Sequence, residues 1–361
     1  MKLIAQVKLQ PPKEQHQALL KTLEMVNDAA NYIGQQAWET KTFRQYDLHR
    51  LLYYDLRTKF HLTAQIVVRV LAKVADTYKL DRKTVRSFNR HGSIAYDKRI
   101  LSWKSAEVSI WTVGGRLKVP FVAGDKQSEL LKYRQGEADL IYRDGDFYVH
   151  QVCEVEEAPT HDPSEFLGVD LGIVNIAADS DGKTYSGGQV NGLRKRHAKL
   201  RGKLQNKGTK AATRLLKKRS RKENCFASHV NHVISKSVVA KAKDTGRGIA
   251  LEDLSGIRDR ITVRKGQRRQ HHSWAFSQLR CFIEYKARLA GVVVKLVNPR
   301  NTSCTCPICG CIDKRNRPSQ SLFSCVSCGF SSAADTVAAV NIGRRALVNE
   351  PCFSPSPIGA G

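Results

Sequence analysis

The feature that most constrains this chain is a pair of Cys-x-x-Cys motifs near its C-terminal end. Cys306, Cys309, Cys325 and Cys328 lie in "CPICGCIDKRNRPSQSLFSCVSCGF", with fifteen residues between the two motifs. One such turn brings two sulfurs onto a tetrahedral ion, and a second turn supplies the other two. The spacing therefore predicts a structural Zn²⁺ site. A glycine follows each motif, where a knuckle turn often needs a permissive backbone.

The alternatives are a disulfide clasp and a redox pair. The opening "MKLIAQVKLQPP" lacks the apolar core of a signal peptide, and no stretch approaches the roughly 18 uninterrupted apolar residues of a membrane span. We therefore expect a cytoplasmic protein with reduced thiols and no membrane partner. Cys304 and Cys311 crowd the first motif, and one of them could replace a ligand. Free thiols are the simpler interpretation, because four ligands are already present.

The charge of the chain indicates its partner. The 361 residues include 60 Lys+Arg against 33 Asp+Glu, a formal net charge of +27 at pH 7. A surface this positive repels itself unless polyanions are its normal partners. Nucleic acid is favoured over an anionic membrane, because no amphipathic or lipidation signal accompanies the charge. The tract 191–222 contains no Asp or Glu. It is either a solvated, disordered segment or, as its leucines favour, a helical surface that faces phosphates.

The N-terminal part of the chain, residues 1–160, predicts a small β-barrel or sandwich. Alternating runs turn at Gly114-Gly115 and at Asp144-Gly145, which are hairpin signals. Residues 13–91 carry apolar side chains at helical spacing. We therefore expect a barrel formed by residues 1–12 and 92–157, with the helical segment as an insertion.

Residues 161–349 alternate apolar strands and helices, which predicts an α/β domain. The zinc ribbon would occupy residues 303–330 of it, and residues 350–361 would be a disordered tail. Three acidic residues stand out in this basic domain. Asp170 lies in the apolar strand "LGVDLGI", Glu252 ends "GIALE", and Asp335 opens the last helix, where the helix dipole favours an anionic side chain.

Each of these residues alone is more often a turn or capping residue, but together they match the order of an RNase H-like nuclease core. Clustered carboxylates repel each other unless they share cations, and their hard oxygens suit Mg²⁺. Two such ions can activate a water and stabilise the leaving oxygen in phosphodiester hydrolysis. Asp253, beside Glu252, is an alternative for the central carboxylate.

Four motifs make a resemblance specific. "GVDLGI", "LEDLSGI", "CPICG…FSCVSCGF" and "ADTVAAVNI" occur in this order, and the opening "VKLQPPKEQHQALLKTLEMVNDAANYI" adds to them. The chain resembles TnpB, the family of RNA-guided nucleases (OrfB-type proteins) that insertion sequences encode and that is related to type V CRISPR effectors. The resemblance implies an RNase H-like RuvC domain with an inserted zinc ribbon. A small wedge β-barrel with an inserted helical recognition lobe would precede it.

The resemblance also implies how the protein acts. It assigns Asp170, Glu252 and Asp335 as the Mg²⁺-binding catalytic carboxylates of a DNA endonuclease, and it favours Glu252 over Asp253. The partners would be a guide RNA from the element end and double-stranded target DNA with its displaced strand. Cleavage would occur next to a short target-adjacent motif, and the cytoplasmic protein would be nucleoid-associated when bound to DNA.

Two other functions are weighed against the nuclease. A cleavage-deficient RNA-guided repressor would have lost active-site carboxylates, but all three are present here. A DDE-type transposase would share the RNase H-like core, but the full motif set argues against it. One departure from the family is Val337, which occupies the place of an Asn in the last motif. That Asn is not one of the three carboxylates, so its loss is expected to weaken activity rather than abolish it.

Overall fold

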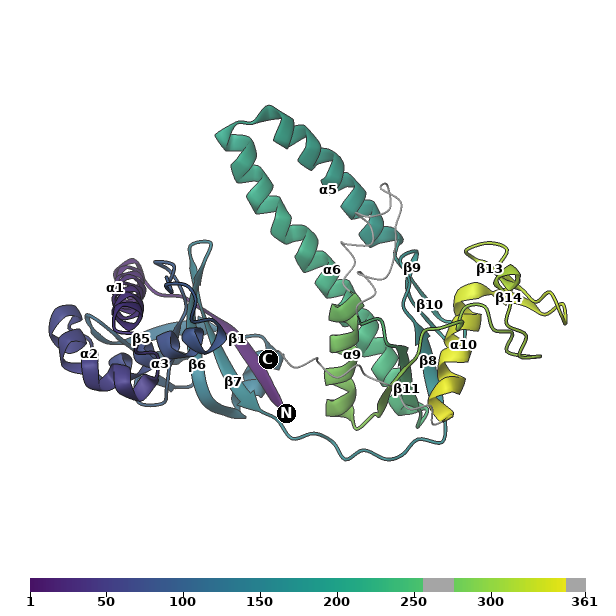
Figure 1. Ribbon diagram of the computed structural model, residues 1–361, viewed down its shortest axis with the longest axis horizontal. Coiled ribbons are helices and arrows are strands. Elements are labelled where there is room, and N and C mark those ends of the chain that lie inside the picture. Colours follow the sequence, from purple (N-terminus) through teal and green to yellow (C-terminus); the bar gives the residue numbers. More distant parts are fainter. Residues whose placement is uncertain (256–275, 349–361) are drawn as a thin grey trace. The chain divides into compact units, whose positions relative to one another are not determined.

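The computed structural model describes residues 1–255 and 276–348 (Figure 1). The chain divides into two compact units, Met1–Glu156 and Glu157–Gly361. The predicted disordered tail, 350–361, lies outside the described residues. Among the helices of the described ranges, none is long and apolar enough to cross a membrane.

The first unit is built on an antiparallel sheet of seven strands, in the order β2-β6-β7-β1-β5-β4-β3. The edge strands β2 (Ile94–Tyr96) and β3 (Leu101–Trp103) follow each other in sequence and are joined by a short turn. The sheet must therefore curl until its edges approach, which gives a nearly closed barrel. The other strands are β1 (Lys2–Leu9), β4 (Glu107–Thr112), β5 (Gly115–Val122), β6 (Arg134–Arg143) and β7 (Asp146–Glu154).

The opening strand joins this barrel, as the sequence predicts. β1 pairs with β7 from Lys2 opposite Glu154 to Lys8 opposite Tyr148. Both predicted hairpins are present. The β4–β5 turn has Gly115 at φ +108°, and the β6–β7 turn has Gly145 at φ +93°, a region that glycine enters without steric cost.

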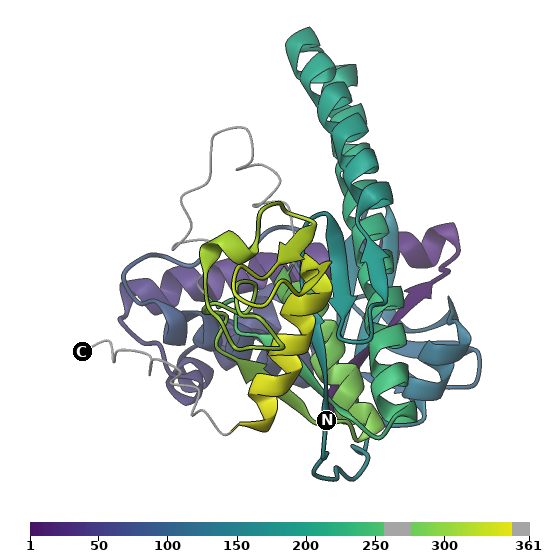
Figure 2. The same cartoon turned by 90° about the vertical axis from the view of Figure 1, so that its right-hand side faces the viewer.

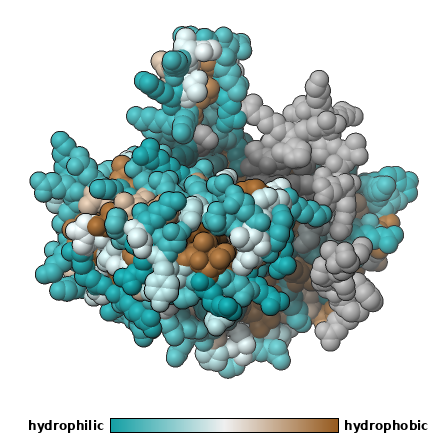
Figure 3. All heavy atoms as spheres, turned by 60° about the vertical axis from the view of Figure 1, so that its left-hand side comes forward, coloured by the Kyte–Doolittle hydropathy of each residue, from teal (hydrophilic) through white to brown (hydrophobic). Residues whose placement is uncertain are grey.

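Three long helices separate β1 from the rest of the barrel. They are α1 (Lys13–Glu39), α2 (Gln45–Phe60) and α3 (Ala64–Leu80), and a short helix, α4 (Asp125–Leu131), follows β5. The apolar stripe of α1 is fully buried and comprises Leu19, Leu23, Val26, Ala30 and Ile33. The apolar spacing thus predicted which face of α1 is buried. The surface around this core is predominantly hydrophilic, with scattered apolar patches (Figure 3).

The second unit contains a mixed sheet of five strands, in the order β10-β9-β8-β11-β12. Its first three strands are antiparallel, whereas β8, β11 and β12 run parallel. The strands are β8 (Phe166–Asp170), β9 (Asn175–Asp179), β10 (Thr184–Ser186), β11 (Gly248–Glu252) and β12 (Val294–Val297). The helices are α5 (Gly188–Lys207), α6 (Lys210–Asp244), α9 (Phe276–Ala290) and α10 (Ala334–Leu347).

Helices cover both faces of this sheet. Leu167, Val169 and Ile249 pack with side chains of α6 and α9 on one face. On the other face, Phe166 and Ala250 pack with side chains of α10. Successive side chains of a strand point to opposite faces, so the residues in step with Phe166 and Ala250 face α10. Figure 2 shows α10, in yellow, alongside the strands.

The basic tract 191–222 forms the greater part of an antiparallel helical hairpin, which projects from the sheet in Figure 1. Gly208, at φ +62°, ends α5, and Thr209 caps α6 by accepting a hydrogen bond from the backbone N–H of Ala212. Between the helices, Glu223 accepts a hydrogen bond from Arg201 (3.2 Å). The predicted helical character of the tract is confirmed, while its contact with phosphates stays a prediction.

The contact between α10 and β8 generates a stability prediction. A Cβ at Gly168 would lie 1.8 Å from the carbonyl oxygen of Ala339 and 2.6 Å from the backbone nitrogen of Gly343. Gly168→Ala is therefore expected to lower the free energy of unfolding by about 3 kcal/mol, because the helix must move off the strand. The measurement is thermal unfolding followed by circular dichroism.

Gly202→Ala is the matched control. Gly202 lies in the exposed helix α5 with no atom near its ideal Cβ position, so alanine is expected to be neutral or to stabilise by up to about 1 kcal/mol. Equal melting temperatures for Gly168→Ala and the original chain would contradict the packing described here.

Candidate active site and metal centre

The sheet places two of the predicted carboxylates side by side. β8 and β11 are parallel neighbours, and Val169 is in register with Leu251. The next residues along the two strands, Asp170 and Glu252, therefore lie at adjacent strand ends. Asp170 follows Phe166 by four residues and Glu252 follows Ala250 by two, so both side chains point to the face of the sheet that α10 covers. This is the crevice at the carboxyl ends of parallel strands where open α/β sheets commonly bind ligands.

The third carboxylate comes from α10. Asp335 is in the first turn of this helix, and α10 packs on the same face of the sheet. Asn175, the first residue of β9, donates a hydrogen bond from Nδ2 to Asp335 Oδ2 (2.9 Å). The guanidinium of Arg317 lies 3.6 Å from Asp335 Oδ1. The fold thus brings all three predicted side chains to one end of the sheet, together with one amide and one guanidinium.

The electrostatics of this group centre on Asp170. Burial raises the pKa of Asp170 to about 7, and the negative charges of Glu252 and Asp335 contribute to the same shift. The guanidinium of Arg317 acts in the opposite direction. Burial also raises the pKa of Glu252, against a hydrogen bond from Thr302 and the positive charges of Arg345 and Arg317. Three acidic groups held this close favour a bound cation that would stabilise their ionised forms.

The donor set fits divalent cations that prefer oxygen ligands. The negative charges of both other carboxylates act on Asp170, so all three side chains belong to one group. The four cysteine sulfurs lie within 4.8 Å of one another. Within the described residues, no three carboxylates bring their oxygens this close together. The oxygens of the three carboxylates are therefore spaced more widely than the sulfurs of the four cysteines. Asp170 remains partly exposed.

The neighbouring carboxylate, Asp253, is engaged elsewhere. Its side chain accepts hydrogen bonds from Ser255 and from Arg280 of α9 (2.6 and 3.0 Å). These donors hold its pKa below the usual range, with the Ser255 hydroxyl as the main cause. A carboxylate already committed to a hydroxyl and a guanidinium is a poor candidate for the central ligand, which favours Glu252.

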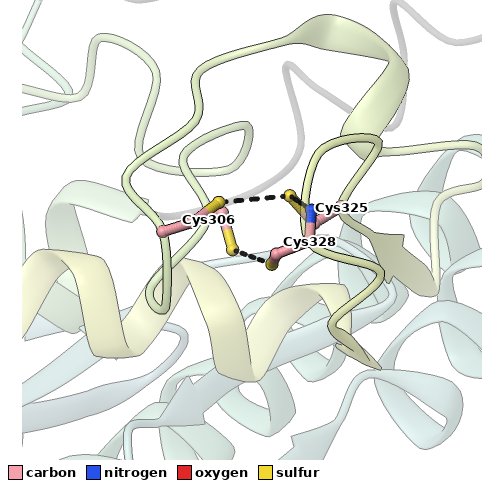
Figure 4. A group of neighbouring side chains, drawn as sticks. Cys306, Cys325 and Cys328 are labelled. Atoms are coloured by element: carbon pink, nitrogen blue, oxygen red, sulfur yellow. Dashed lines mark hydrogen bonds between the residues drawn. The ribbon is translucent and has the colours of Figure 1, made fainter.

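The four cysteines of the predicted ribbon form a compact group (Figure 4). Cys306 Sγ lies 3.6 Å from Cys328 Sγ, and Cys309 Sγ lies 3.5 Å from Cys325 Sγ. A tetrahedral zinc site with bonds of about 2.3 Å places its sulfurs about 3.8 Å apart. These spacings are close to that value and far above the roughly 2.05 Å of a disulfide bond.

The knuckle turns take the predicted form. Gly310 and Gly329 both have φ +73°. Each donates a backbone hydrogen bond to the first cysteine of its motif, at 3.0 and 3.1 Å. The backbone N–H of Cys328 also donates to Cys325 Sγ, and this is the main reason why the pKa of Cys325 falls to about 6. The lowered pKa favours the thiolate, the form that binds metal.

The ribbon contains the 3-10 turn η1 (Lys314–Asn316) and the strands β13 (Leu322–Ser324) and β14 (Ser331–Ala333). Its small core joins Phe323 and Cys325 to Val337 of α10. Cys304 and Cys311 are free thiols outside the four-sulfur group, in agreement with the simpler interpretation of the sequence. Val337, the residue that departs from the family pattern, thus packs against the ribbon.

Sequence reasoning missed three residues of this site. Arg317 comes from the ribbon loop, where it is one basic residue among several and carries no distinguishing signal. Asn175 opens β9 only five residues after Asp170, and nothing in the surrounding sequence marks it as part of a site. Thr302 donates a hydrogen bond from its hydroxyl to Glu252 Oε1 (2.5 Å). Only the tertiary structure reveals these contacts.

Two protein-family models match the chain. The model described as "Probable transposase" (OrfB_IS605) matches residues 150–255, and "Cas12f1-like, TNB domain" matches residues 276–342. Together they include all three carboxylates and all four cysteines of the group.

The curated relatives include TnpB-like protein MJ0751 of Methanocaldococcus jannaschii, 38% identical over 42% of this chain and 54% of the relative. Cas12f1 of Syntrophomonas palmitatica, named a CRISPR-associated endodeoxyribonuclease, is 33% identical over 48% of this chain and 38% of its own length. InsQ of Escherichia coli K12, a putative RNA-guided DNA endonuclease, is 28% identical over 55% and 53%. The chain thus spans about half, or less, of the length of these relatives.

Solved structures show that the fold is shared. A Cas12f1–sgRNA–target DNA complex matches 92% of this chain and 83% of that chain, with a TM-score of 0.56 and 13% identity. The mini-RNA-guided endonuclease CRISPR-Cas_phi3 matches 97% and 93%, with a TM-score of 0.59 and 11% identity. The matched segments and the fold confirm the resemblance that the sequence indicated: this chain is similar to TnpB-like and Cas12f proteins.

Proposed function

We propose that this protein is an RNA-guided DNA endonuclease of an insertion sequence. The observation that carries the proposal is the convergence of Asp170, Glu252 and Asp335 at one end of the five-stranded sheet, in a chain with a formal net charge of +27. Relatives named RNA-guided endonucleases support it. The guide RNA would pair with target DNA, and the protein would contact the backbone and a short adjacent motif.

The three carboxylates would hold Mg²⁺ against the scissile phosphate. When bound, such an ion would supply Lewis-acid chemistry that favours attack of water on the phosphodiester. Asp170, whose pKa is raised by burial and by the charges of both other carboxylates, would be one ligand of that ion. Asn175 donates a hydrogen bond from its amide to Asp335 Oδ2 and would help to orient this carboxylate.

Arg317 has a separate role in the proposal. Its guanidinium reaches the carboxylates from the ribbon and is partly exposed. A cation at this position would be available to a phosphate oxygen, for which a guanidinium is well suited. The ribbon would therefore contribute both a zinc-stabilised fold and one positive charge to the active site.

Two alternatives differ from the nuclease in testable ways. A guided repressor would bind the same target without cutting it. A DDE-type transposase would join DNA strands rather than leave free ends. The intact carboxylates favour the nuclease over the repressor, and the full motif set favours it over the transposase. RNA that co-purifies with the chain, once sequenced, supplies the guide for a cleavage assay on targets with a randomised flank.

The first prediction concerns the carboxylates. Asp170→Ala, Glu252→Gln and Asp335→Ala should each slow Mg²⁺-dependent cleavage on the order of a thousandfold, which corresponds to about 4 kcal/mol of transition-state stabilisation. Guided DNA binding should change little, because the carboxylates repel phosphate when no cation is bound. The assay combines cleavage with gel shift on one guide–target pair.

Asp253→Asn is the matched control for Glu252→Gln, since both remove one negative charge at adjacent positions. It should remain active, because Asp253 already pairs with Arg280. An inactive Asp253→Asn beside an active Glu252→Gln would show that the central carboxylate is assigned wrongly. An original chain that binds but never cuts in Mg²⁺ or Mn²⁺ would establish the repressor instead.

The second prediction concerns the four clustered cysteines, which we propose hold one structural Zn²⁺. Elemental analysis should find one zinc per chain, and the double variant Cys325→Ser/Cys328→Ser should contain none. Because metal binding and folding are coupled in such small modules, the ribbon should also lose its fold. Cys225→Ser/Cys281→Ser, which changes two exposed cysteines of α6 and α9, should keep its zinc. Zinc retained by the first variant would refute the assignment.

The third prediction concerns the hairpin of α5 and α6. Changing the exposed residues Lys203, Lys207, Lys217 and Lys218 to Glu should weaken RNA binding and flatten its dependence on salt. For every phosphate that the hairpin no longer neutralises, the slope of log K against log salt should become shallower by roughly 0.7 to 0.9. The matched control changes the same residues to Arg and preserves the slope. An unchanged slope in the Glu variant would mean that the hairpin is merely solvated.

A further inference from the structure

The loop between β12 and the zinc ribbon, residues 298–305, is fastened to α10 by side-chain hydrogen bonds; we refer to this loop as the strap. Asn341 of α10 is buried and donates from Nδ2 to the carbonyl oxygens of Thr302 (2.8 Å) and Thr305 (2.7 Å). Arg345, one turn later, donates from one guanidinium nitrogen to the carbonyl oxygens of Asn298 (2.8 Å) and Arg300 (2.6 Å). The strap is thus held by side chains along one helix.

The strap brings a hydroxyl to the acidic group. Thr302 is 2% exposed, and its Oγ1 donates to Glu252 Oε1 at 2.5 Å. The same oxygen lies 3.0 Å from the carbonyl oxygen of Pro299. A hydrogen bond to a carboxylate is roughly twice as strong as one between neutral groups. In a buried setting it fixes the orientation of the glutamate side chain, which would otherwise sample several rotamers.

We propose that Thr302 is a positioning residue, whose hydroxyl holds the Glu252 carboxylate in the orientation that binds a divalent cation while Asn341 holds Thr302 in place. The inference rests on the proposed function in that it takes Glu252 as a cation ligand. It adds that the affinity of the carboxylates for the cation depends on Thr302, a neutral side chain that does not itself bind the cation. Partners of this kind typically contribute 10–100-fold to metal affinity or activity.

The arrangement also connects the ribbon to the carboxylates. The strap runs directly into the first knuckle, where the backbone N–H groups of Cys304 and Thr305 donate to the carbonyl oxygen of Asn301. Asn316 of the ribbon donates from Nδ2 to the carbonyl oxygen of Cys304 (2.9 Å). The backbone path from zinc ligand to Thr302 is therefore short and hydrogen-bonded, so that the folded ribbon stabilises the position of the hydroxyl.

The test is a calorimetric titration of Mn²⁺ into the full zinc-loaded chain. Thr302→Val removes the hydroxyl with little change of shape, and Thr302→Ser keeps the hydroxyl. Thr305→Val is the matched control from the same strap, because the hydroxyl of Thr305 donates to the carbonyl oxygen of Asn301 (2.7 Å) and, among the residues that the structure describes, to no carboxylate. Asp170→Asn defines the binding that depends on the carboxylates. Zinc content and melting temperature are measured for each variant.

We expect Thr302→Val to weaken the Asp170-dependent Mn²⁺ binding by about 10-fold or more. Thr302→Ser should restore it to within about threefold, the residual loss being that of one methyl group's packing. Thr305→Val should bind Mn²⁺ like the original chain. All of these variants should keep their zinc. In the cleavage assay, the half-saturating Mg²⁺ concentration should rise most for Thr302→Val, less for Thr302→Ser, and not for Thr305→Val.

Two results would overturn the inference. Either Thr302→Val binds Mn²⁺ like the original chain, or Thr302→Ser is as impaired as Thr302→Val, in which case the residue only packs. A chain that shows the expected Mn²⁺ affinities but never cuts DNA supports the positioning role and refutes the nuclease. The failures of the two proposals are therefore distinguishable.

Discussion

The close contact between α10 and β8 is the constraint on which the second unit depends. Gly168 and Gly343 have no side chains, so the helix and the strand approach until backbone meets backbone. A Cβ at Gly343 would lie 2.8 Å from the carbonyl oxygen of Phe166. This approach sets the depth at which the N-terminus of α10 enters the site. Asp335 therefore comes close to Asp170 because two glycines allow it.

The ribbon has three structural links to the same helix. Val337 packs into the ribbon core, Asn341 holds the strap, and Arg344 donates to the carbonyl oxygen of Pro307 beside the first knuckle. Val337, which departs from the family pattern, lies in the core of the ribbon. Its apolar side chain is 2% exposed and contributes to packing there. The three carboxylates and the four cysteines thus share α10 as a scaffold, and the cysteine ribbon lies directly before the last carboxylate in sequence.

Much of this arrangement could be predicted from the sequence. Alternation and turn chemistry located the hairpins, and the helical spacing of Leu19, Leu23 and Val26 identified the buried face of α1. The cysteine spacing identified all four sulfurs of the compact group. These features are local, and the residues that produce them are neighbours along the chain or follow a fixed period.

The contacts of the acidic group could not be derived in this way. Asn175 and Asp335 are far apart in sequence, as are Thr302 and Glu252, and no periodicity links them. The choice between Glu252 and Asp253 is another example. Sequence position alone leaves both open, and the structure favours Glu252 because Arg280 of α9 already pairs with Asp253. Such tertiary contacts depend on how elements pack, and a single sequence does not encode them in a readable pattern.

The central claim is that the three acidic side chains form one divalent-cation site. Its most direct test is anomalous X-ray diffraction from crystals of the full chain soaked in Mn²⁺, recorded at the manganese absorption edge. The account predicts anomalous density against the carboxylate of Asp170, shared with Glu252 or Asp335, and none in Asp170→Asn crystals. Manganese bound only elsewhere, with the three carboxylates unligated at saturating Mn²⁺, would contradict it.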